Sequence, residues 1–125
     1  MSEQAILVVD DNPSNLKLFT YLLALPGYAV TTAANAEQAL DVLGRLVPDL
    51  IIMDLQLPDV DGLTLTRQLK ADPKMKGVPI VAVTASAMKG DEEKARAAGV
   101  DGYMSKPVEK RAFRAMVASY LERGE

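Results

Sequence analysis

The 125-residue sequence contains no cysteine and no histidine. Without cysteine the chain can form no disulfide bond, thiol nucleophile or thiolate metal site. Without histidine it offers neither an imidazole ligand nor a histidine general base, which excludes serine-hydrolase triads, zinc deaminases and most zinc enzymes. Any chemistry must therefore come from aspartate, glutamate, lysine, serine, threonine and the backbone.

Long apolar runs and an excess of positive charge are also absent. No run approaches the roughly 20 apolar residues that a membrane-spanning helix needs. The first apolar run is not preceded by a basic region, so the N-terminus does not resemble a signal peptide. With 14 Lys and Arg against 17 Asp and Glu, the net charge is −3, which argues against nucleic acid as the main partner. We expect a cytoplasmic protein that does not act at a membrane.

The composition is that of one ordinary globular domain. Hydrophobic residues make up 49% of the chain and charged residues 25%, which excludes wholesale disorder. The length suits a single domain with a core of its own. Since we find no repeat, low-complexity tract or linker, we predict one domain over residues 1–125 without a second, output domain.

Short apolar runs alternate with amphipathic stretches from one end of the chain to the other. Residues 5–9, 50–53 and 78–83 are continuous and apolar, as is typical of strands that are buried on both faces. Residues 28–32 and 102–105 are shorter and more polar, which favours edge strands. The sequence therefore predicts five strands.

Helical patterns separate these runs. The clearest places apolar residues at i, i+3, i+4, i+7 and i+8, and they are Phe113, Met116, Val117, Tyr120 and Leu121. An earlier pattern has the members Ala36, Ala39, Leu40, Leu43 and Val47, with Gly44 inside it. A further helix is expected over residues 87–98.

Capping and breaking residues support these helices. Asn12-Pro13 predicts the start of the first helix, since proline in the first turn loses no hydrogen bond. Asn35 is a candidate N-cap for the second helix. Gly27 and Gly99 lie where helices should stop, and Gly62 is expected only to permit the turn into the third helix.

Five strands that alternate with five helices predict an α/β fold. Short connections between them imply a mostly parallel sheet with right-handed crossovers and helices on both faces. In such sheets, functional groups gather at the carboxyl ends of the strands, near the point where the strand order reverses.

Polar residues follow four of the five predicted strands. Three carboxylates, one hydroxyl and one amine are thereby expected at the same edge of the sheet. The residues at these strand ends are Asp10, Asp11, Asp54, Thr84, Ala85, Ser105, Lys106 and Pro107.

Three neighbouring carboxylates repel one another, by roughly 1 kcal/mol per pair at 4 Å in water and about 4 kcal/mol at an effective dielectric constant near 20. A hard divalent cation relieves this repulsion, and Mg²⁺ accepts one or two carboxylates with water and phosphate in the rest of its shell. A phosphoryl group needs such a cation together with an ammonium and a hydroxyl donor. Asp54, at the end of a central strand, is the best placed nucleophile for an aspartyl phosphate.

Each of these residues also has an ordinary structural explanation. Asp-Asp before Asn-Pro is commonly a helix-capping turn, an aspartate after a strand is commonly a turn residue, and threonine is routine at a strand end. Their joint occurrence at consecutive strand ends favours a functional site.

Four segments in this order resemble the receiver domain of two-component response regulators. They are VVDDN at residues 8–12, DLIIMDLQLPDVDG at 49–62, VTA at 83–85 and GYMSKP at 102–107. Residues 82–99 resemble the single-domain, DivK-like receivers and the receivers of hybrid kinases. The resemblance implies a flavodoxin-like, doubly wound five-stranded parallel sheet of order 2-1-3-4-5.

The resemblance also implies a role for each strand-end residue. Asp54 would accept a phosphoryl group from a sensor histidine kinase or a histidine phosphotransfer protein. Mg²⁺, or Mn²⁺ in its place, would be held by Asp11, Asp54 and the Gln56 main-chain carbonyl, with Asp10 bound through water. The phosphoryl-binding groups would be Thr84, Lys106 and the Ala85 backbone.

Two further features follow from the resemblance. Tyr103 occupies the position of the aromatic switch residue, which turns inward when Thr84 moves toward the phosphate. The Lys106–Pro107 peptide bond is usually cis in the family.

The resemblance and the charge pattern lead to a prediction about the output. Phosphorylation would change the face formed by the fourth helix, fifth strand and fifth helix, and a downstream protein or a second copy of the chain would dock there, so that the protein is a monomer or a phosphorylation-dependent dimer. Basic residues could mark this face, namely Lys89, Lys94, Arg96, Lys110, Arg111 and Arg114. Ordinary solubilising charge explains them equally well.

Two other functions stay open. An aspartate-nucleophile phosphohydrolase would also use a strand-end aspartate and Mg²⁺, although Gln56 stands where its second aspartate is usually found and no insertion is long enough for a cap. A phosphate-independent scaffold would need none of the strand-end residues. Nucleotide binding of the P-loop or Rossmann type is excluded because no glycine-rich loop follows the first strand.

Overall fold

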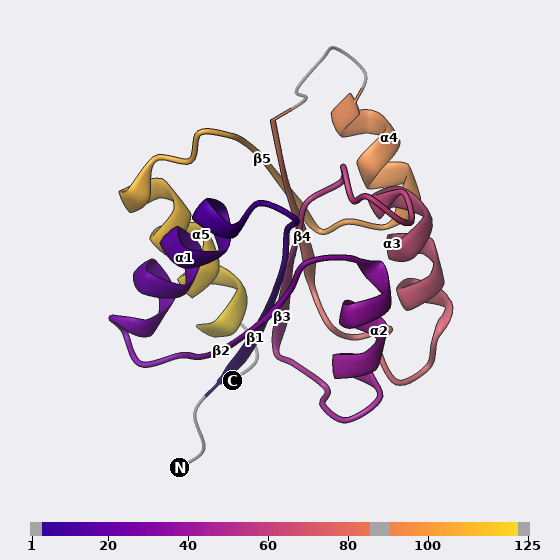
Figure 1. Ribbon diagram of the computed structural model, residues 1–125, viewed down its shortest axis with the longest axis horizontal. Helices are drawn as coiled ribbons and strands as arrows, with labels where there is room; N and C mark the ends of the chain where they lie inside the picture. Colours follow the sequence, from indigo (N-terminus) through magenta and orange to yellow (C-terminus); the bar gives the residue numbers. More distant parts are fainter. Residues whose placement is uncertain (1–3, 86–90, 123–125) are drawn as a thin grey trace.

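The computed structural model describes residues 4–85 and 91–122, and these form a three-layered α/β fold (Figure 1). Five parallel strands lie in the order β2-β1-β3-β4-β5, which confirms the predicted architecture. The strands are β1 Ala5–Val9, β2 Ala29–Ala33, β3 Leu50–Met53, β4 Ile80–Thr84 and β5 Gly102–Ser105. The helices are α1 Pro13–Ala24, α2 Ala36–Leu43, α3 Gly62–Ala71, α4 Asp91–Ala98 and α5 Lys110–Glu122.

Helices cover both faces of the sheet, with α1 and α5 on one side and α2, α3 and α4 on the other (Figure 1). Alternate residues of each central strand face opposite layers, so β1 gives Ile6 and Val8 to the α1–α5 side and Leu7 and Val9 to the other. The three central strands β1, β3 and β4 are almost wholly buried. Their continuous apolar sequence is explained by this two-sided burial.

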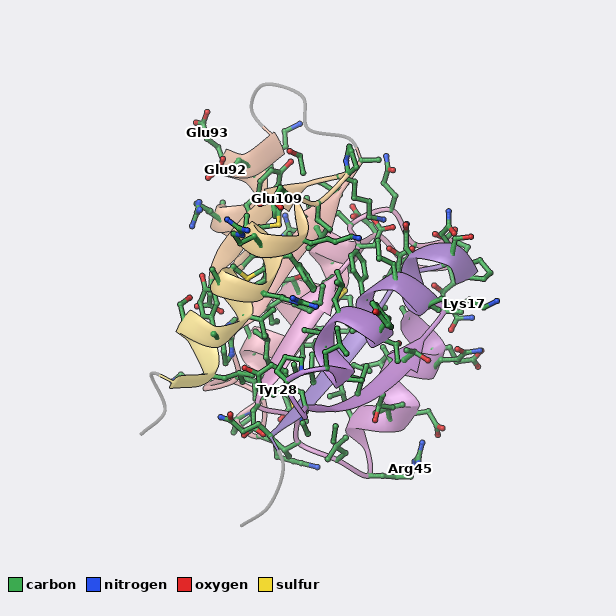
Figure 2. The ribbon with its side chains drawn as sticks, turned by 90° about the vertical axis from the view of Figure 1, so that its left-hand side faces the viewer. Lys17, Tyr28, Arg45, Glu92, Glu93 and Glu109 are labelled. Carbon is green, nitrogen blue, oxygen red and sulfur yellow. The ribbon has the colours of Figure 1, made fainter. Side chains whose placement is uncertain are left out.

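Several charged side chains lie on the outside of these layers. Figure 2 shows Lys17, Arg45, Glu92 and Glu93 pointing away from the body of the protein. Among the described residues, no helix is both long and apolar enough to cross a membrane.

The capping and stop signals operate as the sequence predicts. The Asn12 side chain accepts hydrogen bonds from the Ser14 and Asn15 backbone amides at 2.8 and 3.4 Å. The Asn35 side chain accepts one from the Gln38 amide at 2.8 Å. Gly27 and Gly99 have φ values of +99° and +116°, a region that only glycine adopts without strain.

Three predicted elements have other boundaries in the structure: the second helix, the second strand and the fourth strand. The second helix ends at Leu43 with Gly44 as its C-cap, so Val47 lies outside the helix and Leu40 and Val47 are exposed. The buried side of α2 consists of Ala36, Ala39, Val42 and Leu43.

The fourth strand begins at Ile80 instead of residue 78, directly after Pro79, which has no N–H group to donate to the neighbouring strand. The predicted second strand is displaced by one residue, to Ala29–Ala33. Of the predicted fourth helix, the described part is Asp91–Ala98, and its first residues, including Lys89, lie outside the described residues.

Gly62 does more than permit a turn. A Cβ atom at this position would lie 2.5 Å from Leu55 Cα and 2.8 Å from the Asp54 carbonyl oxygen. Both are backbone atoms, which cannot rotate out of the way. The lack of a side chain therefore lets the first turn of α3 pack directly on the chain that follows β3, where the Gly62 amide donates to the Leu55 carbonyl at 3.0 Å.

Replacing Gly62 with alanine should lower the free energy of unfolding by about 1–3 kcal/mol, because the added methyl group must displace backbone. Urea denaturation measures the loss. Gly77→Ala is the matched control, since a Cβ at Gly77 meets no atom within 4 Å. Equal stability of the two variants would contradict the close approach.

Candidate functional site

Three carboxylates meet at the carboxyl edge of the sheet, as the sequence predicts. Strand β1 pairs with β3 so that Val9 lies opposite Met53, and the next residues are Asp10 and Asp54. A carboxylate oxygen from each of Asp10, Asp11 and Asp54 lies within 4.8 Å of the others. Asp10 and Asp54 are buried, with relative exposures of 1% and 6%, while Asp11 is exposed.

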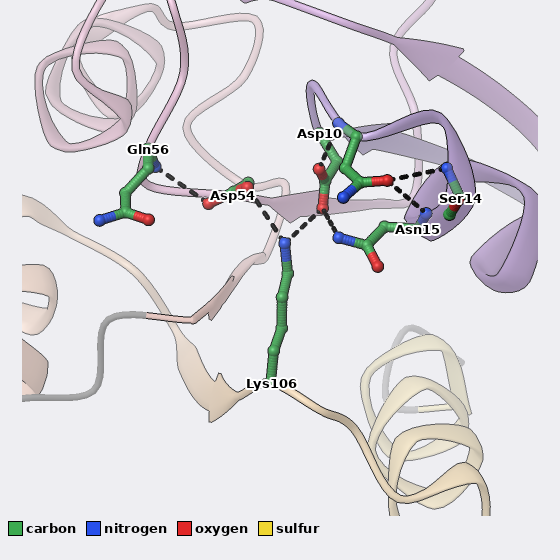
Figure 3. Close-up of polar contacts among 7 residues, drawn as sticks. Asp10, Ser14, Asn15, Asp54, Gln56 and Lys106 are labelled. Atoms are coloured by element: carbon green, nitrogen blue, oxygen red, sulfur yellow. Dashed lines mark hydrogen bonds and ion pairs between the residues drawn. The ribbon is translucent and has the colours of Figure 1, made fainter.

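The ammonium group of Lys106 lies between the two buried carboxylates. Lys106 follows the edge strand β5, and its Nζ is 2.6 Å from Asp10 Oδ2 and 3.1 Å from Asp54 Oδ2 (Figure 3). The Lys106 backbone amide donates to the Thr84 carbonyl at 2.9 Å, which extends the β4–β5 pairing to the lysine. Among the described residues, Lys106 thus pairs with two of the three clustered carboxylates, Asp10 and Asp54.

Hydrogen bonds from the chain itself orient both buried carboxylates. Asp10 Oδ1 accepts from the Asn12 amide at 2.9 Å, and Asp10 Oδ2 accepts from Asn15 Nδ2 at 3.4 Å. Asp54 Oδ1 accepts from the Gln56 amide at 2.9 Å, which leaves Oδ2 toward Lys106 (Figure 3). Each carboxylate is therefore held by backbone on one oxygen and by the cation on the other.

Burial raises the pKa of Asp54 above its ordinary value, because the charged form loses hydration. The Gln56 amide and Lys106 oppose this rise in pKa, and the charge of Asp10 adds to it. Burial also disfavours the charged form of Lys106, but its hydrogen bonds and charge interactions with Asp10 and Asp54 outweigh burial and raise the pKa of the lysine. Lys106 is therefore protonated at neutral pH.

This donor set fits a hard divalent cation. Carboxylate oxygens are the ligands that Mg²⁺ prefers, and Mg²⁺ is usually bound by one or two of them together with water. Three carboxylate oxygens around one point, one of them at the surface, offer such a set. The same three carboxylates are those that the resemblance to receiver domains implies for the metal.

The remaining predicted residues follow the same strands. Thr84 ends β4 and is buried at 1% exposure, and Ala85 follows it at the surface. Tyr103 lies opposite Ala82 on β5 and packs, partly buried, against the core on the α2–α4 side. The Lys106–Pro107 peptide bond is cis.

Sequence reasoning missed two side chains that order the site. Asn15 donates to Asp10 from the first turn of α1; in the sequence it is one polar residue of a helix. Asp59 binds the backbone of α2 from the loop after β3. The only sequence signal for Asp59 was that an aspartate after proline suits a turn.

The geometry defines a class of protein, a doubly wound α/β domain with an acidic, lysine-bearing site at the carboxyl edge of its sheet. The family model for the response regulator receiver domain matches residues 6–118. The chain belongs to this family.

Curated relatives and solved structures agree with the family. The chain is 44% identical over 118 residues to the polar-differentiation response regulator DivK of Brucella anthropi. The match covers 94% of this chain and 96% of that protein. A crystal structure of the receiver domain of the sensor histidine kinase PA1611 from Pseudomonas aeruginosa, with a magnesium ion coordinated in its active-site cleft, is 36% identical. The match covers 97% of this chain and 99% of the PA1611 chain, with a TM-score of 0.88.

A two-component response regulator from Clostridium difficile is similar in fold at a lower identity of 27%. The match covers 98% of this chain and 99% of that one, with a TM-score of 0.92. The chain is thus a DivK-like receiver domain of the two-component response regulators, a signalling domain with a phosphoacceptor role rather than an enzyme in the usual sense.

Replacing Asp54 with asparagine should raise the free energy of unfolding of the metal-free protein at pH 7. Because the pKa of Asp54 is raised by folding, the folded state binds the proton more tightly than the unfolded state, and ionisation destabilises the fold as the pH rises above about 3.9. The gain should therefore shrink as the pH falls from 7 toward 4, in urea denaturation series with a chelator present.

Asp41→Asn is the control, since Asp41 is highly exposed on α2 and its replacement should change stability by less than about 0.5 kcal/mol. A gain for Asp54→Asn that does not depend on pH would contradict the electrostatic cause.

Proposed function

We propose that this receiver is a Mg²⁺-dependent phosphoacceptor switch in which Asp54 takes a phosphoryl group from the phosphohistidine of a sensor histidine kinase or a histidine phosphotransfer protein. The observation that carries the proposal is the position of Lys106 Nζ between Asp10 Oδ2 and Asp54 Oδ2. A phosphoryl group on Asp54 would bring its oxygens to this ammonium, which supplies a positive charge already oriented for them.

The proposed step is an in-line displacement. A carboxylate oxygen of Asp54 attacks phosphorus, the new O–P bond forms, and the P–N bond to the donor imidazole breaks with its electron pair on nitrogen. Lys106 and the Thr84 hydroxyl would bind the phosphoryl oxygens, with the Ala85 amide as a further donor. These roles agree with the family resemblance and with the placement of all three residues at one edge of the sheet.

The residues proposed to hold the metal are Asp11, Asp54 and the Gln56 main-chain carbonyl, with Asp10 bound through water. When bound, Mg²⁺ would neutralise charge on the phosphoryl oxygens. Support comes from the carboxylate cluster and from the magnesium ion in the related PA1611 receiver. Asp54 accepts from the Gln56 amide on Oδ1 and from Lys106 on Oδ2, so the orientation of its carboxylate within the cluster is fixed.

We further propose that the output is a protein contact on the face formed by α4, β5 and α5. Tyr103 lies on β5, which pairs directly with β4, the strand that ends in Thr84. A displacement of Thr84 can therefore affect Tyr103 through a single pair of neighbouring strands. Ala95 anchors α4 to the core with a small side chain, so α4 can shift at low cost. Arg96 is paired with Glu92 at 2.9 Å, so the exposed surface of α4 carries acidic as well as basic groups.

Incubation with acetyl phosphate and Mg²⁺ should add one phosphoryl group, about 80 Da, to the intact protein. The adduct should be absent from Asp54→Asn and from samples treated with a chelator, because nucleophile and metal are then removed. Intact-mass spectrometry measures the adduct. Asp41→Asn should be labelled like the wild type, and labelling of Asp54→Asn to the wild-type level would reject Asp54 as the acceptor.

Amide chemical shifts should report the switch. Addition of a beryllofluoride phosphoryl mimic with Mg²⁺ should move the resonances of Tyr103 and of the described part of α4, in addition to those beside Asp54, because the Thr84 displacement is passed on across β4 and β5. Two-dimensional ¹⁵N spectra of the two states measure this. Changes restricted to the immediate neighbours of Asp54 would reject the proposed output face.

A further inference from the structure

The aspartate that sequence reasoning missed joins the phosphoacceptor loop to a helix far away in sequence. Asp59 lies in the loop between β3 and α3. Its Oδ1 accepts from the Ala36 backbone amide at 3.0 Å and its Oδ2 accepts from the Glu37 amide at 3.0 Å. Both amides belong to the first turn of α2, where helical N–H groups have no partner within the helix. One carboxylate therefore binds two otherwise unpaired donors.

Helix α2 has its own cap as well. Asn35 accepts from the Gln38 amide at 2.8 Å, so Asn35 and Asp59 together bind the first three amides of the helix. The bond to the Ala36 amide is the main cause that lowers the pKa of Asp59, as expected for an ionised carboxylate at a helix N-terminus. Asn35 is thus a local cap next to the helix, while Asp59 caps α2 from the loop between β3 and α3.

The loop that carries Asp59 connects the proposed nucleophile to α3. Its start is held by the Gln56 amide, which donates to Asp54 Oδ1 at 2.9 Å. Its end is held by Gly62, whose amide donates to the Leu55 carbonyl at 3.0 Å. Within residues 57–60, the hydrogen bonds found to any other element of the described structure are those of Asp59. Asp59 thus holds the tip of the loop, residues 57–60, on α2 by hydrogen bonds.

We propose that Asp59 is a positioning residue for the metal site: by holding the loop tip on α2, it keeps the Gln56 main-chain carbonyl where it can serve as a metal ligand. The inference rests on the proposed function, since it concerns the metal that the function requires. Asp59 itself does not touch the metal or the phosphoryl group.

The physical reason lies in the strict geometry of Mg²⁺. This ion demands near-ideal octahedral coordination with ligands at about 2.0–2.1 Å. A loop released at its tip samples more backbone conformations, and metal binding must then order its residues at a cost in conformational entropy. Apolar contacts of Leu57 and Val60 with the core would remain, so the loop should loosen without detaching.

Asp59→Ala and Asn35→Ala form a matched pair, because each removes one N-terminal cap of α2 but only the first frees the loop. We expect Asp59→Ala to weaken Mg²⁺ binding about tenfold, a typical loss for a group that orients metal ligands. Asn35→Ala should stay within about twofold of the wild type in Mg²⁺ affinity, although the loss of this cap also lowers stability. Titration calorimetry with MgCl₂ measures binding, and thermal unfolding measures stability.

Labelling by acetyl phosphate separates positioning from chemistry. For Asp59→Ala the Mg²⁺ concentration that gives half-maximal rate should rise about tenfold, while the rate at saturating Mg²⁺ stays near that of the wild type, since Asp54, Thr84 and Lys106 are untouched. Asp59→Asn keeps one acceptor oxygen, so its Mg²⁺ concentration for half-maximal rate should lie between those of the wild type and Asp59→Ala. This variant replaces the alanine variant if the latter fails to fold.

Two results would overturn the inference: wild-type Mg²⁺ affinity in Asp59→Ala, or an equal loss in Asp59→Ala and Asn35→Ala, which would make the effect one of helix stability. If the wild-type protein itself neither binds Mg²⁺ nor becomes labelled, the proposed function fails and the inference falls with it. The wild-type measurement thus tells the two failures apart.

Discussion

The contact of Lys106 with Asp10 and Asp54 is the interaction on which the arrangement of the site depends. It joins residues 96 and 52 positions apart in sequence, and it links the end of the edge strand β5 to the ends of β1 and β3 across the sheet. Without the ammonium, two buried carboxylates would face each other uncompensated, which would cost several kcal/mol. The parallel register brings the ends of all three strands to one edge of the sheet. The positive charge of Lys106 then lowers the electrostatic cost of burying Asp10 and Asp54 there.

The same site costs the fold some stability. Burial raises the pKa of Asp54, so the ionised carboxylate that could act as nucleophile is held in a less favourable environment than in the unfolded chain. Such costs are common where a site must be ready for a ligand. Under the proposed function, a hard cation or a phosphoryl group that enters the cluster would change this balance, which would give the receiver a physical basis for having two states of different structure.

The loop after β3 illustrates how the scaffold positions such a site. Besides the apolar contacts of Leu57 and Val60 with the core, it is held by the Gln56 amide on Asp54, the close approach of Gly62 to the Leu55 backbone, and the Asp59 carboxylate on α2. The contacts of Gln56 and Gly62 act within a few residues of the chain, while that of Asp59 couples the loop to another helix of the same layer. Helix α2 thereby becomes part of the support of the site, although it contributes none of the proposed ligands.

The alternation of strands and helices, the caps at Asn12 and Asn35, and the strand ends at which Asp10, Asp54 and Lys106 appear can be predicted from the sequence, because they depend on local periodicity and on backbone preferences. Which polar atoms meet depends instead on the folded arrangement. The position of Lys106 between two particular oxygens, the bond of Asp59 to α2 and the lack of space at Gly62 depend on strand register and on the distance between layers. Contacts of this kind leave no local pattern, since their partners are 22 or more residues apart or lie in the backbone itself.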